Sequence, residues 1–366
     1  MVRILFLTSP IGLGHASRDI AVADELVGSG VGMDEILFVT GGAAYSHIRD
    51  SGYNVLDAYR GKSIDASDGV FRHRLIWLLD YLSFYRECKR IASSIIASYR
   101  PALVVSDEDF AGVAAASTLG TRSVLITDVF ESRFLHGPSS LLERILNRYL
   151  RSIIAMADMV IVPMNVNEED EYVHGYAAGN VVYVGPMVRR VSRGRDELRR
   201  VFGFDGYRVI LVSVGGTSSG RFLVERAIDA YTSIMDSFSM PTKLVIVSGP
   251  SIDVRIPDGV DGRVECHGYV RNMHEMVYAA DLLISLAGRS TMDEARVYGT
   301  PSVFIPIKGH FEQEENARRY GFSYEDVYRL EDIMLEYLTK GERSAPVSNG
   351  ANEAASRILS MLHTKY

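Results

Sequence analysis

Short runs of β-branched and other apolar residues alternate along the chain with amphipathic stretches and turn residues. Parallel strands that are buried on both faces by crossover helices produce this pattern. Five runs lie in the first half of the chain, at residues 3–7, 35–39, 102–106, 123–127 and 159–162. Five more lie in the second half, at residues 209–214, 243–248, 264–267, 282–286 and 302–306. The alternation therefore predicts an α/β protein with two doubly wound sheets of similar build.

A polar, arginine-rich stretch without periodicity follows Pro186, so we place the domain boundary near residues 186–200. Residues 1–188 then form an N-terminal Rossmann-like domain, and residues 189–350 form a C-terminal Rossmann-like domain. Residues 351–366 have small and apolar side chains at helical spacing, which indicates a closing helix that can pack back on the first domain. A length of 366 residues is sufficient for two domains.

Charge and cysteine content exclude several classes of protein. A net charge of −7, spread without long acidic runs, argues against nucleic-acid binding, which needs a basic face to neutralise phosphates. The two cysteines, Cys88 and Cys266, lack the spacing of a disulfide framework or a zinc site, which favours the cytoplasm. We find no run of about 18 apolar residues, so membrane contact would be peripheral, at the inner face.

A glycine-rich loop joins the first predicted strand to an amphipathic helix. Gly12 and Gly14 supply a tight turn and allow close approach of the backbone to a ligand. A dinucleotide fingerprint would need a third small residue where Ser17 stands and an acidic residue where the second strand ends at Thr40. The sequence therefore disfavours a dehydrogenase and leaves a loop that can face a phosphate or an acceptor.

His15 and Arg18 are the candidate functional side chains of this loop. A histidine near a helix N-terminus meets a macrodipole that disfavours its protonated form, so His15 is a candidate general base. The alternative is that it caps the helix or binds a ligand without proton transfer. Arg18 can reach a phosphate or a carboxylate, or make an ordinary surface ion pair.

Two acidic residues follow the third strand of the first half. Asp107 or Asp109 would lie on an adjacent strand end and could orient the imidazole of His15. Residues 107–109 also spell Asp-x-Asp, a short pattern that can bind a metal ion together with a nucleotide. Because so short a pattern recurs by chance and here precedes a helix start, we predict no metal ion.

Two loops of the second half can bind an anion. Gly215, Gly216 and Thr217 follow a strand, without the Gly-Lys-Ser/Thr of a Walker A motif. The second loop leads through Gly288 into a helix whose first turn contains Arg289, Ser290 and Thr291, followed by Glu294. Free amides there could hold a phosphate while Glu294 accepts hydrogen bonds from a ribose. The alternative is a capping box formed by the same hydroxyl and acidic side chains.

The second half resembles the donor-binding block of GT-B glycosyltransferases. The resemblance covers residues 267–270, 288–294, Pro301, Pro306 and 312–317. It is closest to the MurG-like family, which includes the peptidoglycan lipid-intermediate N-acetylglucosaminyltransferase and archaeal relatives. The loop of residues 12–18 is similar to the N-terminal glycine loop of that family.

The resemblance implies the GT-B fold, two Rossmann-like domains with a cleft between them, and a role for each matched residue. The backbone at Val270 would read the uracil, Glu294 would hold the ribose, and the amides of residues 288–291 with Gly216 would hold the diphosphate. Glu312 and Gln313 would bind the donor sugar, and Asn316 would support their loop. Glu312 stands where relatives often have Asp or Gln, and the N-terminal loop has fewer glycines, which leaves the sugar and the acceptor open.

We therefore predict an inverting, metal-independent transferase that moves a hexose or N-acetylhexosamine from a UDP-sugar to an acceptor hydroxyl. The identity of the acceptor stays open, with a glycan and a lipid-linked molecule as candidates, and we expect no cofactor. One alternative is a UDP-sugar hydrolase of the pseudaminic-acid-pathway type, which resembles the chain in its Gly-x-Gly-His loop. Another is a non-catalytic subunit that binds nucleotide sugars.

Residues 141–151 combine an apolar face with three arginines. The pattern favours a helix packed on the sheet with solvated arginines. The alternative is a helix that rests on an anionic membrane surface beside a lipid-linked acceptor. Apolar residues 77–85 belong either to the core or to the acceptor side.

Overall fold

A computed structural model describes most of the chain. The described residues are 2–61, 66–67, 69–135, 137–165, 179–215, 218–249, 252–257, 259–260 and 262–363. They divide into two compact units. Unit 1 comprises Met1–Ser63, His73–Arg189 and Ser348–Tyr366, and unit 2 comprises Ile64–Arg72 and Arg190–Val347.

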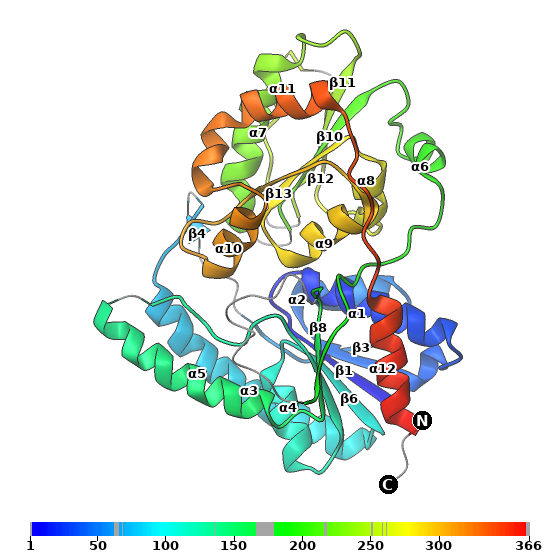
Figure 1. The fold of residues 1–366 in the computed structure, drawn as a ribbon, viewed down its shortest axis with the longest axis vertical. Helices are drawn as coiled ribbons and strands as arrows, with labels where there is room; N and C mark the ends of the chain where they lie inside the picture. Colours follow the sequence, from blue (N-terminus) through cyan, green and yellow to red (C-terminus); the bar gives the residue numbers. More distant parts are fainter. Residues whose placement is uncertain are drawn as a thin grey trace. The chain divides into compact units, whose positions relative to one another are not determined.

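Unit 1 is built on a parallel sheet of seven strands in the order β3-β2-β1-β6-β7-β8-β9 (Figure 1). The strands are β1 (Ile4–Thr8), β2 (Ile36–Thr40), β3 (Asn54–Asp57), β6 (Leu103–Asp107), β7 (Ser123–Ile126), β8 (Met159–Val162) and β9 (Val181–Tyr183). β1, β2 and β6 are fully buried, as expected for strands that helices cover on both faces.

Six helices within the described residues of unit 1 surround this sheet. They are α1 (Gly14–Gly28), α2 (Gly42–Asp50), α3 (Arg74–Tyr99), α4 (Phe110–Thr118), α5 (Ser140–Ile154) and α12 (Ala351–His363). α12 lies beside α1 in Figure 1, and its apolar face joins the core cluster that contains Ile4 and Ile20. The C-terminal helix is therefore part of unit 1, although unit 2 precedes it in the chain.

Unit 2 contains a parallel sheet of five strands in the order β12-β11-β10-β13-β14. The strands are β10 (Arg208–Ser213), β11 (Thr242–Val247), β12 (Val264–His267), β13 (Leu282–Leu286) and β14 (Ser302–Ile305). The helices are α6 (Arg195–Val201), α7 (Arg221–Ile234), α8 (Met273–Ala279), α9 (Arg289–Tyr298), α10 (Phe311–Arg319) and α11 (Leu330–Lys340).

A small antiparallel pair, β4 (Ala66–Ser67) and β5 (Val70–Phe71), belongs to unit 2 although it comes from the first half of the chain. Two backbone hydrogen bonds join it to the segment after β14: Phe71 N donates to Lys308 O, and Lys308 N donates to Gly69 O. The predicted boundary near residues 186–200 leaves this segment in the N-terminal domain, so it does not anticipate that Ile64–Arg72 belong to unit 2.

Each sheet has one point where the strand order reverses. In unit 1 it lies between β1 and β6, and in unit 2 it lies between β10 and β13. Ligands of open α/β sheets bind beyond the carboxyl ends of the strands at such a point. The loops that follow β1, β6, β10 and β13 are therefore the places to look for function.

Candidate functional site

The first site forms at the reversal point of unit 1, where Thr8 of β1 pairs with Asp107 of β6. Gly12 has a φ of +83°, a conformation that side chains other than glycine rarely adopt, and so allows the chain to turn directly into α1. α1 begins at Gly14, so His15 lies in its first turn, as the sequence predicts. No side chain caps the helix at Leu13.

His15 contacts the carboxylate of Asp107. The distance between His15 Nδ1 and Asp107 Oδ1 is 2.9 Å, and the histidine side chain is 21% exposed while Asp107 is fully buried. Arg18 Nη2 lies farther from the same nitrogen, at 3.3 Å. Because an ionised carboxylate only accepts hydrogen bonds, Nδ1 carries the hydrogen and Nε2 keeps a free lone pair. This is the arrangement of a general base with an orienting acid.

Arg18 binds the same carboxylate from the buried side. Its Nε donates to Asp107 Oδ2 at 2.8 Å and its Nη2 to Oδ1 at 2.5 Å, and the arginine is only 3% exposed. Burial alone would raise the pKa of Asp107, but the charges of Arg18 and His15 outweigh it and lower that pKa to about 2. Arg18 thus forms a buried ion pair within the protein rather than a surface ion pair, and its guanidinium faces a carboxylate.

Glu108 was not singled out by the sequence. Its Oε2 lies 3.7 Å from His15 Nε2, and its φ of +46° is unusual for a residue other than glycine. Backbone strain of this kind is frequent at functional sites. Glu108 therefore places a second carboxylate near His15 Nε2, the ring nitrogen that does not contact Asp107.

Asp109 has hydrogen-bond partners other than His15. Tyr59 donates a hydrogen bond to Asp109 Oδ2 at 2.7 Å, and the carboxylate also caps α4 by accepting from Gly112 N. Burial raises the pKa of Asp109 to about 6. Of the two acids considered for orienting His15, the structure brings Asp107 to it and gives Asp109 a different partner. Among the described residues no group of three or more His, Cys, Asp or Glu side chains is arranged to hold a metal ion.

The second site forms at the reversal point of unit 2, where α9 follows β13. Gly288 is the N-cap of α9, and no side chain caps the helix there. A capping box by Ser290 or Thr291 is therefore absent from this helix start. A side chain added at Gly288 would meet no atom within 4 Å, so the space beside this N-cap is open. The amides of Arg289, Ser290 and Thr291 follow it in the first turn of α9.

Buried polar side chains lie behind these amides. Glu294, one turn into α9, is 8% exposed, and Asn316 of α10 is 3% exposed. Asn316 Nδ2 donates to the carbonyl oxygen of Ala287 at 3.2 Å, which ties α10 to the turn that carries Gly288. This bond is a physical basis for the supporting role that the resemblance implies for Asn316.

The remaining predicted donor residues follow the carboxyl ends of neighbouring strands. Gly215 follows β10 with a φ of +78°, and Val270 follows β12. Gly216 and Thr217 lie outside the described residues. Glu312 and Gln313 occupy the first turn of α10 after β14, where Gln313 Oε1 accepts a hydrogen bond from Ile307 N at 3.0 Å. Its amide NH₂ group is then the donor that a ligand could meet.

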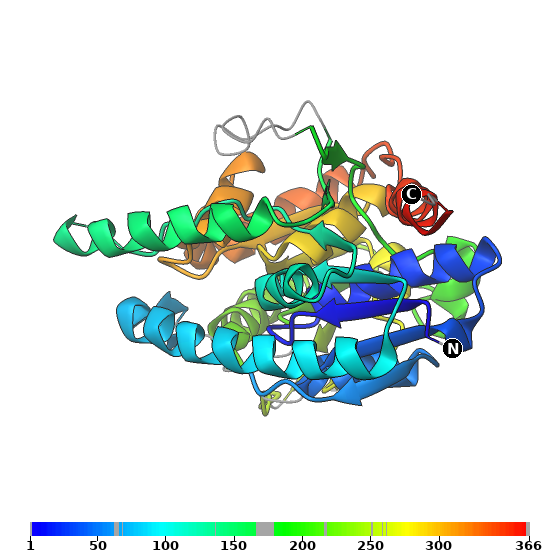
Figure 2. The ribbon, with the colours of Figure 1, turned by 90° about the horizontal axis from the view of Figure 1, so that it is seen from below.

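The apolar face of α5 packs on unit 1 only through its C-terminal turns, where Ile153 and Ile154 join a core cluster and Leu150 packs against it, so the packing that the sequence favours is observed for part of the helix. Leu141, Ile145 and Tyr149 are 64%, 62% and 51% exposed, and only Glu143, Ile153 and Ile154 of this helix are buried. Figure 2 shows α5, in green, running alongside α3, in cyan. Exposed apolar side chains of the first turns of α3, Leu75, Ile76 and Leu79, add to this surface.

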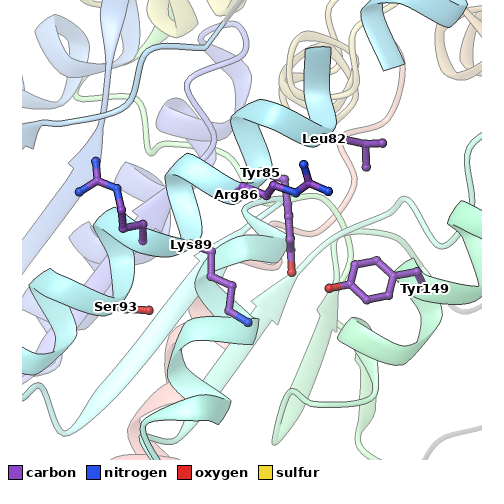
Figure 3. Close-up of a pocket in the computed structure, with 7 residues that line it drawn as sticks. Leu82, Tyr85, Arg86, Lys89, Ser93 and Tyr149 are labelled. Atoms are coloured by element: carbon purple, nitrogen blue, oxygen red, sulfur yellow. The ribbon is translucent and has the colours of Figure 1, made fainter. Parts of the chain in front are cut away.

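A basic hollow lies between α3 and α5. It has a volume of about 610 Å³ and is lined by Leu82, Tyr85, Arg86, Lys89, Arg90, Ser93 and Tyr149. Figure 3 shows the hydroxyl groups of Tyr85 and Tyr149 pointing toward one another. Within the described ranges, the three cationic side chains have no carboxylate partner.

Comparison with known proteins assigns a class to this architecture. Residues 209–340 match the glycosyltransferase family 28 C-terminal domain. An uncharacterised glycosyltransferase of Methanopyrus kandleri is 31% identical over 59% of this chain and 60% of its own length. The UDP-N-acetylglucosamine--N-acetylmuramyl-(pentapeptide) pyrophosphoryl-undecaprenol N-acetylglucosamine transferase of Paenarthrobacter aurescens is 33% identical over 37% of this chain and 38% of its own length.

The fold agrees with that of solved glycosyltransferases. The kitacinnamycin glycotransferase superposes with a TM-score of 0.65 over 99% of both chains, at 16% sequence identity. The two doubly wound units have the fold of GT-B glycosyltransferases, so the fold class predicted from the sequence is confirmed. In sequence, residues 209–340 are similar to the glycosyltransferase family 28 C-terminal domain, and just over a third of the chain is similar to a MurG-like transferase. No helix in the described part is long and apolar enough to span a membrane.

Proposed function

We propose that the chain is an inverting glycosyltransferase that moves a hexose or N-acetylhexosamine from a UDP-sugar to an acceptor hydroxyl. The observation that supports it most is the contact of 2.9 Å between His15 Nδ1 and Asp107 Oδ1 at the reversal point of unit 1. A binding protein needs no histidine that is oriented in this way. The same contact weighs against the non-catalytic alternative.

The donor is assigned to unit 2. The uncapped N-terminus of α9 offers amides to a diphosphate, and Glu294 offers a carboxylate to the ribose hydroxyls. A related transferase is named for a UDP-N-acetylglucosamine substrate, which makes UDP-N-acetylhexosamines the first donors to test. In this proposal Val270, Gly215, Gly216 and Thr217 complete the nucleotide site, and Glu312 and Gln313 bind the sugar.

The chemical step is a direct displacement. The acceptor hydroxyl gives its proton to His15 Nε2 while its oxygen forms a bond to the anomeric carbon. The bond between that carbon and the β-phosphate oxygen breaks, and UDP leaves with the electron pair, so the configuration inverts. Asp107 stabilises the imidazolium that forms, and Glu108 lies near the nitrogen that has taken the proton.

Helix amides can stabilise the leaving diphosphate without a divalent ion. Donors that are fixed before the reaction stabilise developing negative charge at little cost of reorganisation. We therefore propose that the reaction needs no metal and no cofactor. Residual turnover in EDTA tests this point directly.

A UDP-sugar hydrolase would use the same residues, with water in place of the acceptor. The two activities differ in one measurement. Steady release of free sugar from the donor in the absence of any acceptor supports the hydrolase, whereas release that depends on an added acceptor supports the transferase.

We further propose that the exposed face of α3 and α5 rests on an anionic membrane, where a lipid-linked acceptor would lie. Leu141, Ile145 and Tyr149 supply apolar contact, and the basic hollow supplies complementary charge. Each lysine or arginine near an anionic leaflet contributes on the order of 1 kcal/mol.

The experiment that tests the donor assignment is a thermal-shift titration. UDP and UDP-N-acetylhexosamines should raise the melting temperature by mass action, whereas ADP and GDP at equal concentration should not. An equal shift with all three diphosphates would contradict uracil recognition, and no shift with any of them would remove the donor site.

A further inference from the structure

A buried acid lies behind the His15–Asp107 pair and has no role in the chemistry described above. Asp19 is the sixth residue of α1, and its side chain has no solvent exposure. Thr8 of β1 donates a hydrogen bond to Asp19 Oδ2 at 2.5 Å. Asp19 Oδ1 is fully buried and has no hydrogen-bond donor among the described residues.

Asp19 of α1 lies close to Asp107, the last residue of β6. Thr8 and Asp107 are direct neighbours on β1 and β6, so the two acids flank the same threonine. Asp107 also raises the pKa of Asp19, both by its charge and by a hydrogen bond between the two side chains. Two carboxylate oxygens in contact both accept, so a hydrogen bond between them requires a proton on one of the acids.

Charge balance indicates which acid carries that proton. Arg18 is the cation that contacts Asp107, through its Nε and Nη2, and its remaining nitrogen, Nη1, lies 3.9 Å from a second carboxylate, Asp128 Oδ1. Ionised Asp107 and Arg18 form a neutral pair, and a second buried charge on Asp19 would have no counterion. Burial and the neighbouring charge of Asp107 raise the pKa of Asp19 well above its usual value, while the hydrogen bond from Thr8 and the charge of Arg18 oppose that rise.

We propose that Asp19 is kept in the fold as a neutral carboxylic acid whose hydroxyl group donates to Asp107, which makes it a positioning residue for the His15–Asp107 pair. The proton satisfies Asp19 Oδ1, which otherwise lacks a partner. Asp107 is then held by Arg18 on one side and by Asp19 on another, and it stays ionised toward His15. This positioning role rests on the proposed function, whereas the protonation state of Asp19 does not.

Infrared spectroscopy of the full chain at pH 8 tests the protonation state without any substrate. A protonated carboxyl group has a C=O band that an ionised one lacks, and Asp109 is ionised at this pH because its pKa is about 6. We expect the band in the wild type, its loss in Asp19→Asn and its retention in Asp109→Asn. A spectrum of Asp19→Asn that has lost no such band overturns the proposal, whatever the enzymatic activity proves to be.

A second substitution covers the case in which Asp19→Asn does not fold. Thr8→Val removes the hydrogen bond to Asp19 Oδ2, so the same band should persist and move to higher frequency. A band that does not move in Thr8→Val belongs to another residue and contradicts the assignment to Asp19.

The positioning role has its own readout. An asparagine can donate to Asp107 and accept from Thr8, so Asp19→Asn should keep turnover within about threefold of the wild type. Asp19→Ala loses the donor, so its turnover should fall roughly tenfold. The acid limb of its kcat/KM profile should also move to higher pH. Without the hydrogen bond from Asp19, Asp107 attracts the proton of His15 more strongly, so a higher pH is needed to free the base. Equal losses in the two variants, or an unmoved profile in Asp19→Ala, overturn the positioning role.

Discussion

Asp107 Oδ1 accepts the Nδ1 hydrogen of His15 at 2.9 Å across 92 residues of sequence. The contact exists because β1 and β6 are neighbours in the sheet, so that the loop after one strand and the end of the other reach the same place. The geometry leaves Nε2 as the only ring nitrogen that can take a proton from a substrate. Two substitutions follow from it.

His15→Ala should lower kcat by about 10²–10⁴-fold, the usual contribution of a general base. The melting-temperature shift caused by UDP should not change, because the donor is assigned to unit 2. His363→Ala, at an exposed histidine of α12, is the matched control and should retain full turnover. Wild-type turnover in His15→Ala would remove the base role.

Arg18→Met should destabilise the fold by about 3–5 kcal/mol, because it leaves the buried carboxylate of Asp107 without its cation. Urea unfolding followed by circular dichroism measures this loss. Arg193→Met breaks an exposed pair with Glu197 and should cost less than about 1 kcal/mol. Equal losses in the two variants would mean that burial of the Arg18–Asp107 pair has no energetic consequence.

The sequence predicts most of both sheets because their central strands are continuous apolar runs. All ten predicted strands are present, and three of them, β8, β12 and β13, have the predicted bounds. β3 and β9 were missed, since they are short edge strands with few fully buried residues. The β4–β5 pair was also missed, because two-residue strands have no periodicity to detect.

The contacts of the candidate site depend on spatial relations that sequence spacing does not contain. His15 and Asp107 were paired correctly because both follow neighbouring strands. Tyr59 and Asp19 were not considered, since Tyr59 follows a strand that was missed and Asp19 comes directly after the matched loop of residues 12–18. A signal for Asp19 does exist, because an acid among the apolar residues of an amphipathic helix is a candidate for burial with a partner. The exposed face of α5 was predicted to pack, since amphipathicity alone does not tell which surface covers it.

Glu294→Gln tests the ribose contact. The KM for the UDP-sugar should rise about tenfold with a smaller change in kcat, because a charge-assisted hydrogen bond to the nucleotide is lost in substrate and transition state alike. Glu331→Gln, at an exposed position of α11, should leave KM unchanged. A wild-type KM in Glu294→Gln would contradict the assignment of Glu294 to the donor.

Leu141→Ser combined with Ile145→Ser tests the membrane-facing surface. The double variant should bind vesicles that contain anionic phospholipid several-fold more weakly than the wild type in sedimentation assays, because the apolar contact of α5 is lost. Vesicles of neutral lipid should bind neither form, and added salt should weaken wild-type binding. Leu119→Ser, at an exposed leucine after α4, is the control. Equal binding of neutral and anionic vesicles would contradict the charge complementarity.

Asp109 should make the stability of the fold depend on pH. Its pKa is raised to about 6 in the folded chain, above the ordinary value of 3.8, because the side chain is buried. The folded state therefore binds this proton more tightly than the unfolded state does. The resulting stabilisation is complete below about pH 4 and is lost as the pH rises through 6, by about 3 kcal/mol in total.

Asp109→Asn cannot titrate at this position and keeps a side chain that can cap α4. The free energy of unfolding of the variant, measured relative to the wild type, should therefore rise between pH 4 and pH 7 by up to about 3 kcal/mol. Contributions of other acids cancel in this difference. Asp332→Asn, at an exposed position of α11, should show no such trend. If the difference between Asp109→Asn and the wild type is constant over this range, Asp109 is ionised throughout, and the hydrogen bonds from Tyr59 and Gly112 then outweigh its burial.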